Sequence, residues 1–541
     1  MKFDNLTEDN IEFIKDTYSA KELSWDERML KLMKYLGKSE RTVRKWLVKL
    51  GIKQKQQEDS PQLKSARKKK ISKKTNRYII TWAQNNTPVH EVFLRNMEAY
   101  ASEIDAEIII IAGRYKNPTS VFEDKEHETW HSRTKPYLYA GTQSIHKHLI
   151  VVGDVKISPT AVIPMTSMEG FSGPESCIFG HPKVQMQMVP VLEDCPPKKM
   201  MTTGACTLPN YTDSKAGKKG EFHHTLGFAI VEIKNKNKFF TRQVIATDDG
   251  NFNDFIYNVK FDGGNKKLNV VPGLTFLSDE IEGTSVISRN KEIEAAILGD
   301  IHFGEHDQDV IDATLNVLFK KLKPKQVILH DVFDGYSISH HDEKDPFAQF
   351  HKEVDGRNDL NKEIELMLEG LEPFSKYNCV IVRSNHDDFL DRWLTRLDWR
   401  KASTMKNTLS YFKFSTLLAE RKAPKGIIPY VINERYPEMI TLGRSDSHRV
   451  GKWELGQHGD VGASGSRGSI NQFRRLNTKM IIGHSHSPNR KDGVIQVGTS
   501  THLRVGYNIG PSSWLQSHAI IHSDGKAQQI DFIGGEFTTF E

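Results

Sequence analysis

Apolar residues in the C-terminal half of the chain fall into four short runs, and each run is followed by Asp, Asn or His. The runs cover residues 295–298, 327–329, 379–382 and 480–482, and they precede, in order, Asp300 with His302, Asp331, Asn385 with His386 and Asp387, and His484 with His486. Short apolar runs of this kind predict strands that are buried on both faces. Because polar side chains at the carboxyl ends of such strands meet at one edge of a sheet, the pattern predicts one site for more than one metal ion.

The N-terminal 51 residues carry the pattern of three amphipathic helices. Thr7 predicts the start of a helix that runs to about Tyr18, and Ser24 with Glu27 predicts a capping box for a second helix. Ser39 precedes a third helical pattern over residues 40–50, with apolar residues at positions i, i+3, i+4 and i+7.

Basic residues lie mainly on the other side of this third helix. Two helices joined by a short turn containing glycine, the second with a basic face, resemble a helix-turn-helix. We therefore expect Arg41, Arg44 and Lys45 to contact DNA. Small three-helix units also serve as protein-contact modules, which is the alternative for this region.

Residues 77–285 predict an α/β domain of their own. Apolar runs at 78–82 and 106–112 flank a helical pattern over 89–103, which indicates a βαβ unit. Further strand patterns lie at 147–153, 225–233 and 239–245. The sequence predicts no role for this domain.

The length of the chain and the distribution of its charge predict how many domains it has and where they begin. Its 541 residues suffice for two or three domains, and the net charge of +6 is unevenly distributed. Residues 53–77 contain eight lysines and two arginines against Glu58 and Asp59, a net charge of +8. Such a run is typical of a disordered linker and equally suits a tether that neutralises phosphates. We predict a helix-turn-helix-like domain at 1–51, a basic linker at 52–76, the middle domain at 77–285 and a catalytic domain at 286–541.

The cysteine spacing and the hydropathy predict a cytoplasmic protein. None of the four cysteines forms a Cys-x-x-Cys pair, which favours reduced thiols over a zinc finger or a disulfide framework. No apolar run is long enough to span a bilayer, so we expect no association with membranes. A homo-oligomer is compatible with these features.

The order of the polar motifs resembles that of the calcineurin-like metallophosphoesterase family, over roughly residues 292–541. The chain has Asp-x-His at 300–302, Asp-x-x-Asp at 331–334, Asn-His-Asp at 385–387, a later lone His, and Gly-His-x-His at 483–486. His330 and Ser384 stand where the family motifs have glycine. The resemblance implies a C-terminal α/β/β/α sandwich that holds two divalent metal ions.

The resemblance also implies a role for each motif residue. The first ion would be held by Asp300, His302, Asp331 and His486, and the second by Asp331, Asn385, His484 and the lone histidine. We assign the lone histidine to His458, which is followed by glycine as in the family, with His448 as the alternative. His386 matches the proton donor to the leaving oxygen, and Asp387 the residue that orients it. Nitrogen and oxygen ligands without a thiolate suit Mn²⁺, Fe²⁺ or Zn²⁺, and their hardness favours Mn²⁺.

The kind of substrate is predicted from one residue that differs from the family motif and from the positive charge of the N-terminal region. Protein phosphatases of this superfamily have an arginine where the chain has Gly335, which argues against a phosphoprotein substrate. The N-terminal unit and the basic run favour a polyanion. The nuclease branch, represented by the double-strand-break repair nucleases of SbcD type, is the best match, although those enzymes usually have His in place of Asp334. The arrangement of the whole chain is similar to nucleases of lytic tailed phages that degrade host DNA.

The expected function is therefore two-metal hydrolysis of DNA, in the host cytoplasm if a phage encodes the chain. Arg467 in a Gly/Ser-rich loop, followed by Arg474 and Arg475, predicts contacts to the phosphate backbone, with a plain flexible connection as the alternative. Two other functions remain open. One is a small-molecule phosphodiesterase or nucleotidase, and the other is a DNA-bound regulator with a vestigial site.

Overall fold

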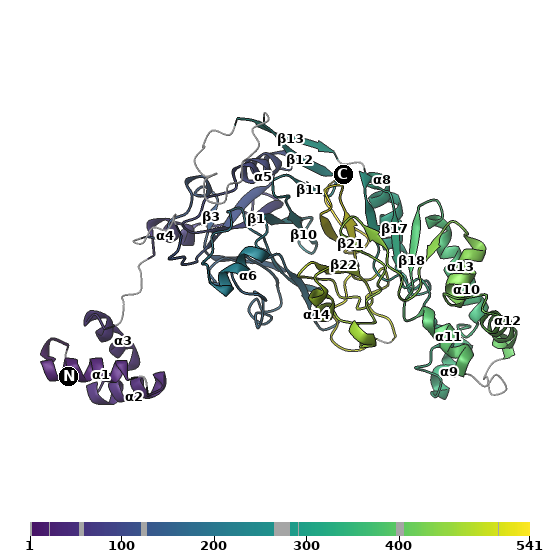
Figure 1. Ribbon diagram of the computed structural model, residues 1–541, viewed down its shortest axis with the longest axis horizontal. Coiled ribbons are helices and arrows are strands. Elements are labelled where there is room, and N and C mark those ends of the chain that lie inside the picture. Colours follow the sequence, from purple (N-terminus) through teal and green to yellow (C-terminus); the bar gives the residue numbers. More distant parts are fainter. Residues whose placement is uncertain are drawn as a thin grey trace. The chain divides into compact units, whose positions relative to one another are not determined.

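The computed structural model describes residues 3–20, 22–52, 59–120, 127–263, 282–289, 292–396, 405–506 and 508–540. The chain divides into two compact units, Met1–Ser60 and Pro61–Glu541, and each is described by itself (Figure 1). The described residues form a mixed α/β protein with several sheets. None of their helices has the length and apolar character needed to cross a membrane.

The first unit consists of the helices α1 (Glu8–Ser19), α2 (Trp25–Leu36) and α3 (Glu40–Lys49). Thr7 and Ser24 cap α1 and α2, each in a reciprocal capping box with the side chain three residues later. Gly37 ends α2 in the left-handed conformation that glycine adopts without strain. The apolar faces of the three helices form a small core around Leu32, Val43 and Leu47. The predicted helices are confirmed.

A six-stranded sheet forms the centre of the C-terminal half of the second unit. Its strands lie in the order β19-β18-β17-β15-β25-β26, in which the first four are parallel and the last two antiparallel to their neighbours. The bounds are β15 (Ala295–Ile297), β17 (Val327–His330), β18 (Cys379–Val382), β19 (Ile440–Thr441), β25 (Ser517–Ile521) and β26 (Ala527–Asp531). All four apolar runs of the sequence are strands; the fourth belongs to another sheet.

Side chains of β15 alternate between two cores, because successive residues of a strand point to opposite faces. Ala296 joins the core that contains the helices of this half, whereas Ala295 and Ile297 face a second sheet. The helices that contribute to the first core are α7 (Gln308–Ala313), the π-helix η3 (Thr314–Leu318), α8 (Phe319–Lys321), α10 (Leu360–Leu371), α11 (Asp387–Arg396), α12 (Thr408–Ala419) and α13 (Ile427–Arg435). The remaining helix between β17 and β18, α9 (Pro346–Val354), has exposed apolar side chains.

The second sheet has ten strands and combines segments from both parts of the unit. Its order is β20-β21-β22-β24-β23-β7-β8-β6-β5-β4. The C-terminal strands are β20 (Arg449–Val450), β21 (Trp453–Glu454), β22 (Lys479–Ile482), β23 (Asn489–Lys491) and β24 (Val494–Gln496), and the others are β4 (Thr142–His146), β5 (Leu149–Val152), β6 (Ser176–Phe179), β7 (Met186–Val189) and β8 (Lys198–Thr202). Trp453, Ile481 and Ile495 pack against the inner face of the six-stranded sheet. The short helix α14 (Ile470–Phe473) packs on Met480 and Val494 of the same sheet.

A five-stranded sheet, in the order β10-β9-β1-β2-β3, covers the other end of the ten-stranded sheet. Its strands are β1 (Arg77–Gln84), β2 (Glu107–Gly113), β3 (Leu138–Tyr139), β9 (Gly227–Ile233) and β10 (Phe239–Ile245). β1 and β2 are parallel and joined by α5 (Glu91–Glu103), so the predicted βαβ unit is confirmed. Besides short 3-10 helices, the remaining elements of the described residues are α4 (Pro61–Lys68), α6 (Lys215–His223), β11 (Phe252–Asp254), β12 (Tyr257–Asp262), β13 (Thr284–Arg289), β14 (Glu292–Ile293) and β16 (Lys323–Pro324).

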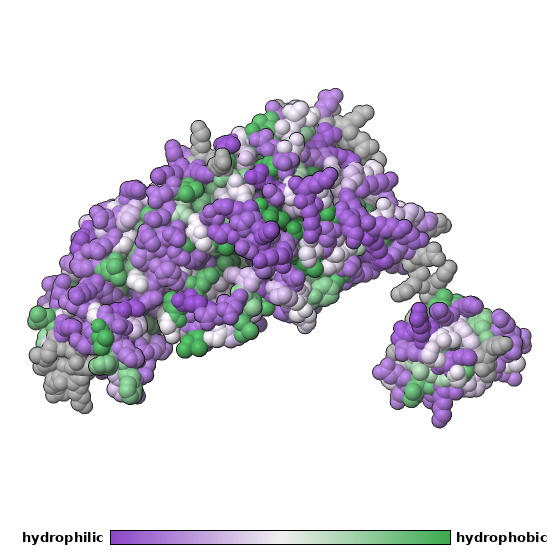
Figure 2. Space-filling model, turned by 180° about the vertical axis from the view of Figure 1, so that it is seen from behind, coloured by the Kyte–Doolittle hydropathy of each residue, from purple (hydrophilic) through white to green (hydrophobic). Residues whose placement is uncertain are grey.

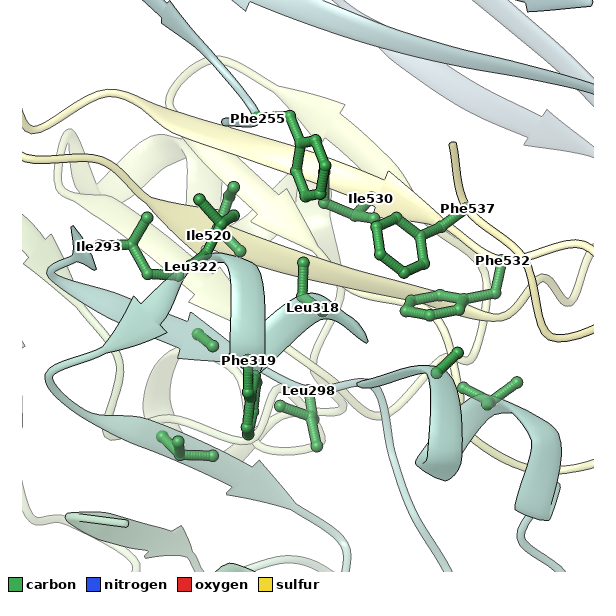
Figure 3. Packing of buried hydrophobic residues seen from close by; sticks show 14 of the residues in the cluster. Phe255, Ile293, Leu298, Leu318, Phe319, Leu322, Ile520, Ile530, Phe532 and Phe537 are labelled. Carbon is green, nitrogen blue, oxygen red and sulfur yellow. The ribbon is translucent and has the colours of Figure 1, made fainter. Parts of the chain in front are cut away.

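One continuous core joins the middle region to the C-terminal half (Figure 3). Phe255 of the middle region packs edge-on against Phe537, with ring centroids 5.5 Å apart, and Ile530 of β26 lies beside them. Burial of each such side chain contributes about 1.5–3 kcal/mol. Hydrophilic residues cover most of the face shown in Figure 2.

Part of the stretch predicted as a basic linker is instead a helix. Residues 53–58 lie outside the described residues, but α4 buries Leu63 and Ala66 in the same core as α5. These two residues are three apart and share one helix face, so the lysines and Arg67 of α4 occupy its outer side.

Candidate metal centre

The four motifs meet at the carboxyl ends of strands from two sheets. Asp300 and His302 follow β15, Asp331 follows β17 and Asn385 follows β18, all in the six-stranded sheet, whereas His486 follows β22 of the ten-stranded sheet. Because the two sheets pack face to face, the loop after β22 comes to lie beside the loops after β15 and β17.

Asp300, His302, Asp331 and His486 form a group whose possible ligand atoms lie within 4.8 Å of one another. Nε2 of His302 lies 3.3 Å from Oδ2 of Asp331 and 3.2 Å from Nε2 of His486, and the latter atom lies 3.2 Å from Oδ2 of Asp300. All four side chains are buried. Two carboxylates and two imidazoles in this arrangement are a donor set for a divalent cation.

A second group of donors shares Asp331 with the first. Nε2 of His458 lies 3.4 Å from Oδ2 of Asp331, and Nδ1 of His484 lies 3.0 Å from Oδ1 of Asn385. The rings of His458 and His484 are 5.3 Å apart. The alternative lone histidine, His448, bonds instead to Gln326 at 2.8 Å, which supports the choice of His458.

The backbone of the site is strained at four positions. His302, Asp331, His484 and His486 all have positive φ, between 47° and 75°, although none is glycine. Left-handed conformations of such residues cost on the order of 1–3 kcal/mol each and gather at functional sites. Gly483 lies beside them, where an added Cβ would stand 2.2 Å from Oδ1 of Asp300.

Opposite charges set the protonation of the cluster. Burial opposes ionisation of Asp300, but His458 and His486 outweigh it and lower the pKa of this carboxyl to about 2. Burial would lower the pKa of His302 and of His458, yet the neighbouring carboxylates, Asp331 foremost, raise both pKa values to about 9. Because metal ligation requires neutral imidazole, binding of an ion would release these protons.

Several buried donor atoms of the cluster lack a protein partner. Among the described residues, Oδ1 of Asp300 and Oδ1 of Asp331 accept no hydrogen bond, and Nε2 of the neighbouring His330 has none either. A buried polar atom without a partner costs about 1–3 kcal/mol. Such atoms on converging carboxylates and imidazoles fit divalent metal ions as their binding partners.

His386 is held at the edge of this cluster by Asp334. Its Nδ1 lies 2.5 Å from the main-chain oxygen of Asp334, so this nitrogen carries a proton and donates it. The Oδ1 atom of Asp334 lies 3.2 Å from Nδ1 of His302. Asp334 therefore orients both histidines, a role that its place in the sequence had not predicted.

Asp387, expected to orient His386, has a side-chain hydrogen bond with Ser384 at the start of α11. Its Oδ2 accepts the N–H of Ser384 at 2.9 Å, and Oγ of Ser384 accepts the N–H of Asp387 at 3.1 Å. This reciprocal pair has the form of a capping box. Ser384 in place of glycine thus fixes the turn that presents Asn385 and His386.

His330 is also part of the cluster, although the sequence suggested only a spacer. It is buried, its Nδ1 lies 3.5 Å from Nδ1 of His458, and it forms a third possible ligand group with Asp300 and His458. Burial lowers its pKa to about 4, so the ring is neutral. The signal that could have identified it is a polar residue at the last position of an otherwise apolar strand.

The basic residues predicted to contact DNA differ in their surroundings. Arg467 and Arg475 are exposed, whereas Arg474 forms an ion pair with Asp492 at 2.9 Å and is half-buried. In the first unit Arg41 and Lys45 are exposed on α3, and Arg44 pairs with Glu40 one turn earlier. Arg474 therefore has a structural partner in the protein.

No protein-family model and no solved structure matches the chain. The sequence is similar to Protein A1 of Escherichia phage T5, with 29% identity over 487 residues, which cover 86% of this chain and 83% of that protein. A similarity of this extent is not limited to the residues around the metal centre.

Proposed function

We propose that the chain is a two-metal phosphodiesterase that hydrolyses DNA. The observation that carries the proposal is the position of Asp331, whose Oδ2 lies 3.3 Å from His302 on one side and 3.4 Å from His458 on the other. A carboxylate shared by two sets of donors is what a pair of cations needs in order to lie close together. The fold proposed for residues 286–541 is the metallophosphoesterase α/β/β/α sandwich, and the two packed sheets with helices on the outer face support it.

The first ion would be held by Asp300, His302, Asp331 and His486, and the second by Asp331, Asn385, His458 and His484. His330 contacts His458, with the two Nδ1 atoms 3.5 Å apart. When bound, two such ions neutralise the phosphate and supply a nucleophile at neutral pH. The donors are oxygen and nitrogen, so Mn²⁺ is the preferred metal.

His386 would donate a proton to the leaving oxygen. Its Nδ1 is already engaged with Asp334, which leaves Nε2 as the nitrogen for this task. Its ring lies against that of the proposed ligand His302, with ring centroids 4.5 Å apart, and the two histidines form a further group of possible ligands with Asp334. The engagement of its Nδ1 by Asp334 favours the role of proton donor over that of ligand. Its substitution is therefore expected to change turnover rather than metal content.

A diester is the better candidate substrate than a monoester. The residue after Asp334 is Gly335, with φ 72°, where an added Cβ would lie 3.0 Å from Phe389. An arginine at this position would be strained and crowded, so the phosphate-holding cation of the phosphatases has no counterpart there. A phosphodiester carries one negative charge less than a phosphomonoester, so its binding does not need this additional cation.

The first unit supports DNA as the target, and we propose host DNA in the host cytoplasm because the similar protein belongs to a phage. The exposed basic residues of α3 suit a helix-turn-helix that contacts phosphates. The intact donor set weighs against a regulator with a vestigial site. A small-molecule phosphodiesterase is the competing function, and the following assay separates the two.

Hydrolysis of bis-p-nitrophenyl phosphate and of p-nitrophenyl phosphate is measured with Mn²⁺, with and without competing DNA. We expect faster cleavage of the diester and strong competition by DNA. Replacing Arg467 and Arg475 by alanine should impair DNA cleavage far more than cleavage of the small diester, and Arg435→Ala, an exposed arginine on α13, is the control. A preference for the monoester, or no competition by DNA, would exclude the proposed nuclease.

A further inference from the structure

The middle region repeats the strand order of the catalytic half. In the five-stranded sheet β1 is followed by the parallel strands β2 and β3 on one side and by the antiparallel strands β9 and β10 on the other. In the six-stranded sheet β15 is followed by β17 and β18 on one side and by β25 and β26 on the other, with the same directions. The chain visits the strands in the same sequence in both sheets.

The ten-stranded sheet consists of two equivalent halves that meet at its centre. Along β4-β5-β6-β8-β7 the successive pairings are antiparallel, parallel, parallel and antiparallel. Along β20-β21-β22-β24-β23 they are the same. The equivalent strands β7 and β23 pair with each other in antiparallel fashion, as they would across a two-fold axis.

Hydrogen bonds between loops show the same equivalence at the level of single residues. After β8, Cys206 donates its N–H to the main-chain oxygen of Trp82 at 2.8 Å; after β24, Ser500 donates to that of Asp300 at 2.7 Å. The next residue of each loop forms an isolated antiparallel bridge to the segment that precedes the first helix of its half. Trp82 therefore occupies the position of the metal-site carboxylate Asp300.

The segment after β6 carries the counterpart of the Gly-His-x-His motif. Residues 178–183 read Ile-Phe-Gly-His-Pro-Lys, and residues 481–486 read Ile-Ile-Gly-His-Ser-His. A Cβ on Gly180 would meet Ile111 at 2.5 Å and Trp82 at 2.8 Å, just as a Cβ on Gly483 would meet Asp300. Lys183 thus stands at the place of the proposed ligand His486.

We infer that residues 77–262 are a second copy of the catalytic fold that no longer has a metal site, and that this copy acts as a built-in partner which holds the His486 loop in place. Tryptophan and lysine at two ligand positions cannot form the donor set. The role as a partner rests on the proposed function, because it assumes that His486 binds metal.

The copy contacts the chain on both sides of the segments that position His486. β7 pairs with β23, which begins three residues after His486. Beyond β7, Val191 exchanges two main-chain hydrogen bonds of 2.9 Å with Ser512. Two residues later Trp514 packs its ring 4.1 Å from that of His486. Without the copy, both of these segments would be left without their main-chain partners.

A buried ion pair fixes the same junction. Lys183 of the copy pairs with Asp492 in the turn between β23 and β24, and its side chain is 4% exposed. The lysine also donates to the main-chain oxygen of Val162 at 2.6 Å, so its ammonium group is tied both to the copy and to the catalytic half. Lys183 and Asp492 are therefore positioning residues for the loop between β22 and β23.

The test compares Lys183→Met with Lys199→Met in the full chain. Lys199 of β8 forms a buried ion pair with Asp531 of β26. This pair also joins the two halves, but β26 is the edge strand of the six-stranded sheet. The Mn²⁺ dissociation constant is measured by titration calorimetry and the apo protein's Tm by circular dichroism. We expect both variants to lower Tm, but only Lys183→Met to raise the dissociation constant, by about tenfold, the lower end of the effect of outer-shell changes.

Asp492→Asn, which keeps the side-chain volume, is expected to act as Lys183→Met does. Equal dissociation constants in the wild type and both charge variants at this junction, or an equal rise in the Lys199→Met control, would overturn the positioning role while leaving the proposed function intact. A wild type that binds no Mn²⁺ would refute both. Ions retained by an Asp300→Ala/Asp331→Ala variant would show that the copy still binds metal.

Discussion

Replacing Gly483 by alanine is expected to displace one carboxylate of the metal centre and little else. The added Cβ would stand 2.2 Å from Oδ1 of Asp300, and the next atoms are 3.2 Å and 3.3 Å away. This clash is about 1 Å closer than nonbonded atoms approach. Gly483 has no left-handed φ, so its backbone conformation allows alanine. The effect of the substitution therefore depends only on the clash of the added Cβ with Asp300.

The clash is relieved when the carboxylate of Asp300 moves by roughly 1 Å. Its Oδ2, which accepts the N–H of His484 at 2.7 Å, has to move with it. A misplacement of this size in a catalytic group costs about 10²-fold in rate. We expect a decrease of that order in Mn²⁺-dependent cleavage of bis-p-nitrophenyl phosphate, with a weaker dissociation constant for Mn²⁺.

Gly217→Ala in α6 is the control, because its Cβ would stand 1.8 Å from the main-chain oxygen of Thr212, outside the segments that pair with the metal-site half. Overpacking there costs about 1–3 kcal/mol of stability, which a lowered Tm would report, and leaves metal binding unchanged. Wild-type activity in Gly483→Ala, or an equal decrease of metal affinity in both alanine variants, would refute the assignment of Asp300 as a ligand.

Three further predictions concern other parts of the chain. His386→Ala should keep its metal content and decrease turnover by about 10²–10⁴-fold; metal analysis that shows one ion fewer would make His386 a ligand instead. Arg242→Met should lower the free energy of unfolding by about 3–5 kcal/mol, because it leaves Glu232 and Asp254 buried without their cation; an unchanged Tm would contradict this. Deleting residues 1–58, which spares the packed helix α4, should weaken DNA binding and reduce the log–log salt slope by about one unit for every phosphate that the deleted residues neutralise; an unchanged slope would assign the first unit to protein contacts.

Local signals in the sequence predicted the elements and most of the site. Ser24 with Glu27 and the apolar spacing of α3 are short-range patterns, and the structure reproduces both. The motif residues were predicted to follow buried strands, and they do, because each apolar run by itself is typical of a strand. Asp334 and His330 were missed as contributors since their role depends on neighbours from other strands, His302 and His458.

Non-local pairing explains what the sequence did not predict. The join between β7 and β23 brings Gln187 beside Asn489, and no local pattern specifies a partner so distant in the chain. The duplication was hidden because the residues that identify the catalytic copy are its ligands, and the other copy has Trp82 and Lys183 at two of these positions. The strand order, the equivalent loop hydrogen bonds and the surroundings of Gly180 reveal it.

Asp331 and its neighbours are proposed to form a metal centre that cleaves DNA. The most direct measurement incubates the purified full chain, wild type and Asp331→Ala, with linear and circular DNA in the presence of Mn²⁺ or EDTA, alongside metal analysis of both proteins. The wild type is predicted to bind two ions and degrade DNA only with Mn²⁺, and the variant to lose both properties. Degradation in EDTA, or an active Asp331→Ala protein that retains two ions, would show that Asp331 does not bridge a catalytic metal pair.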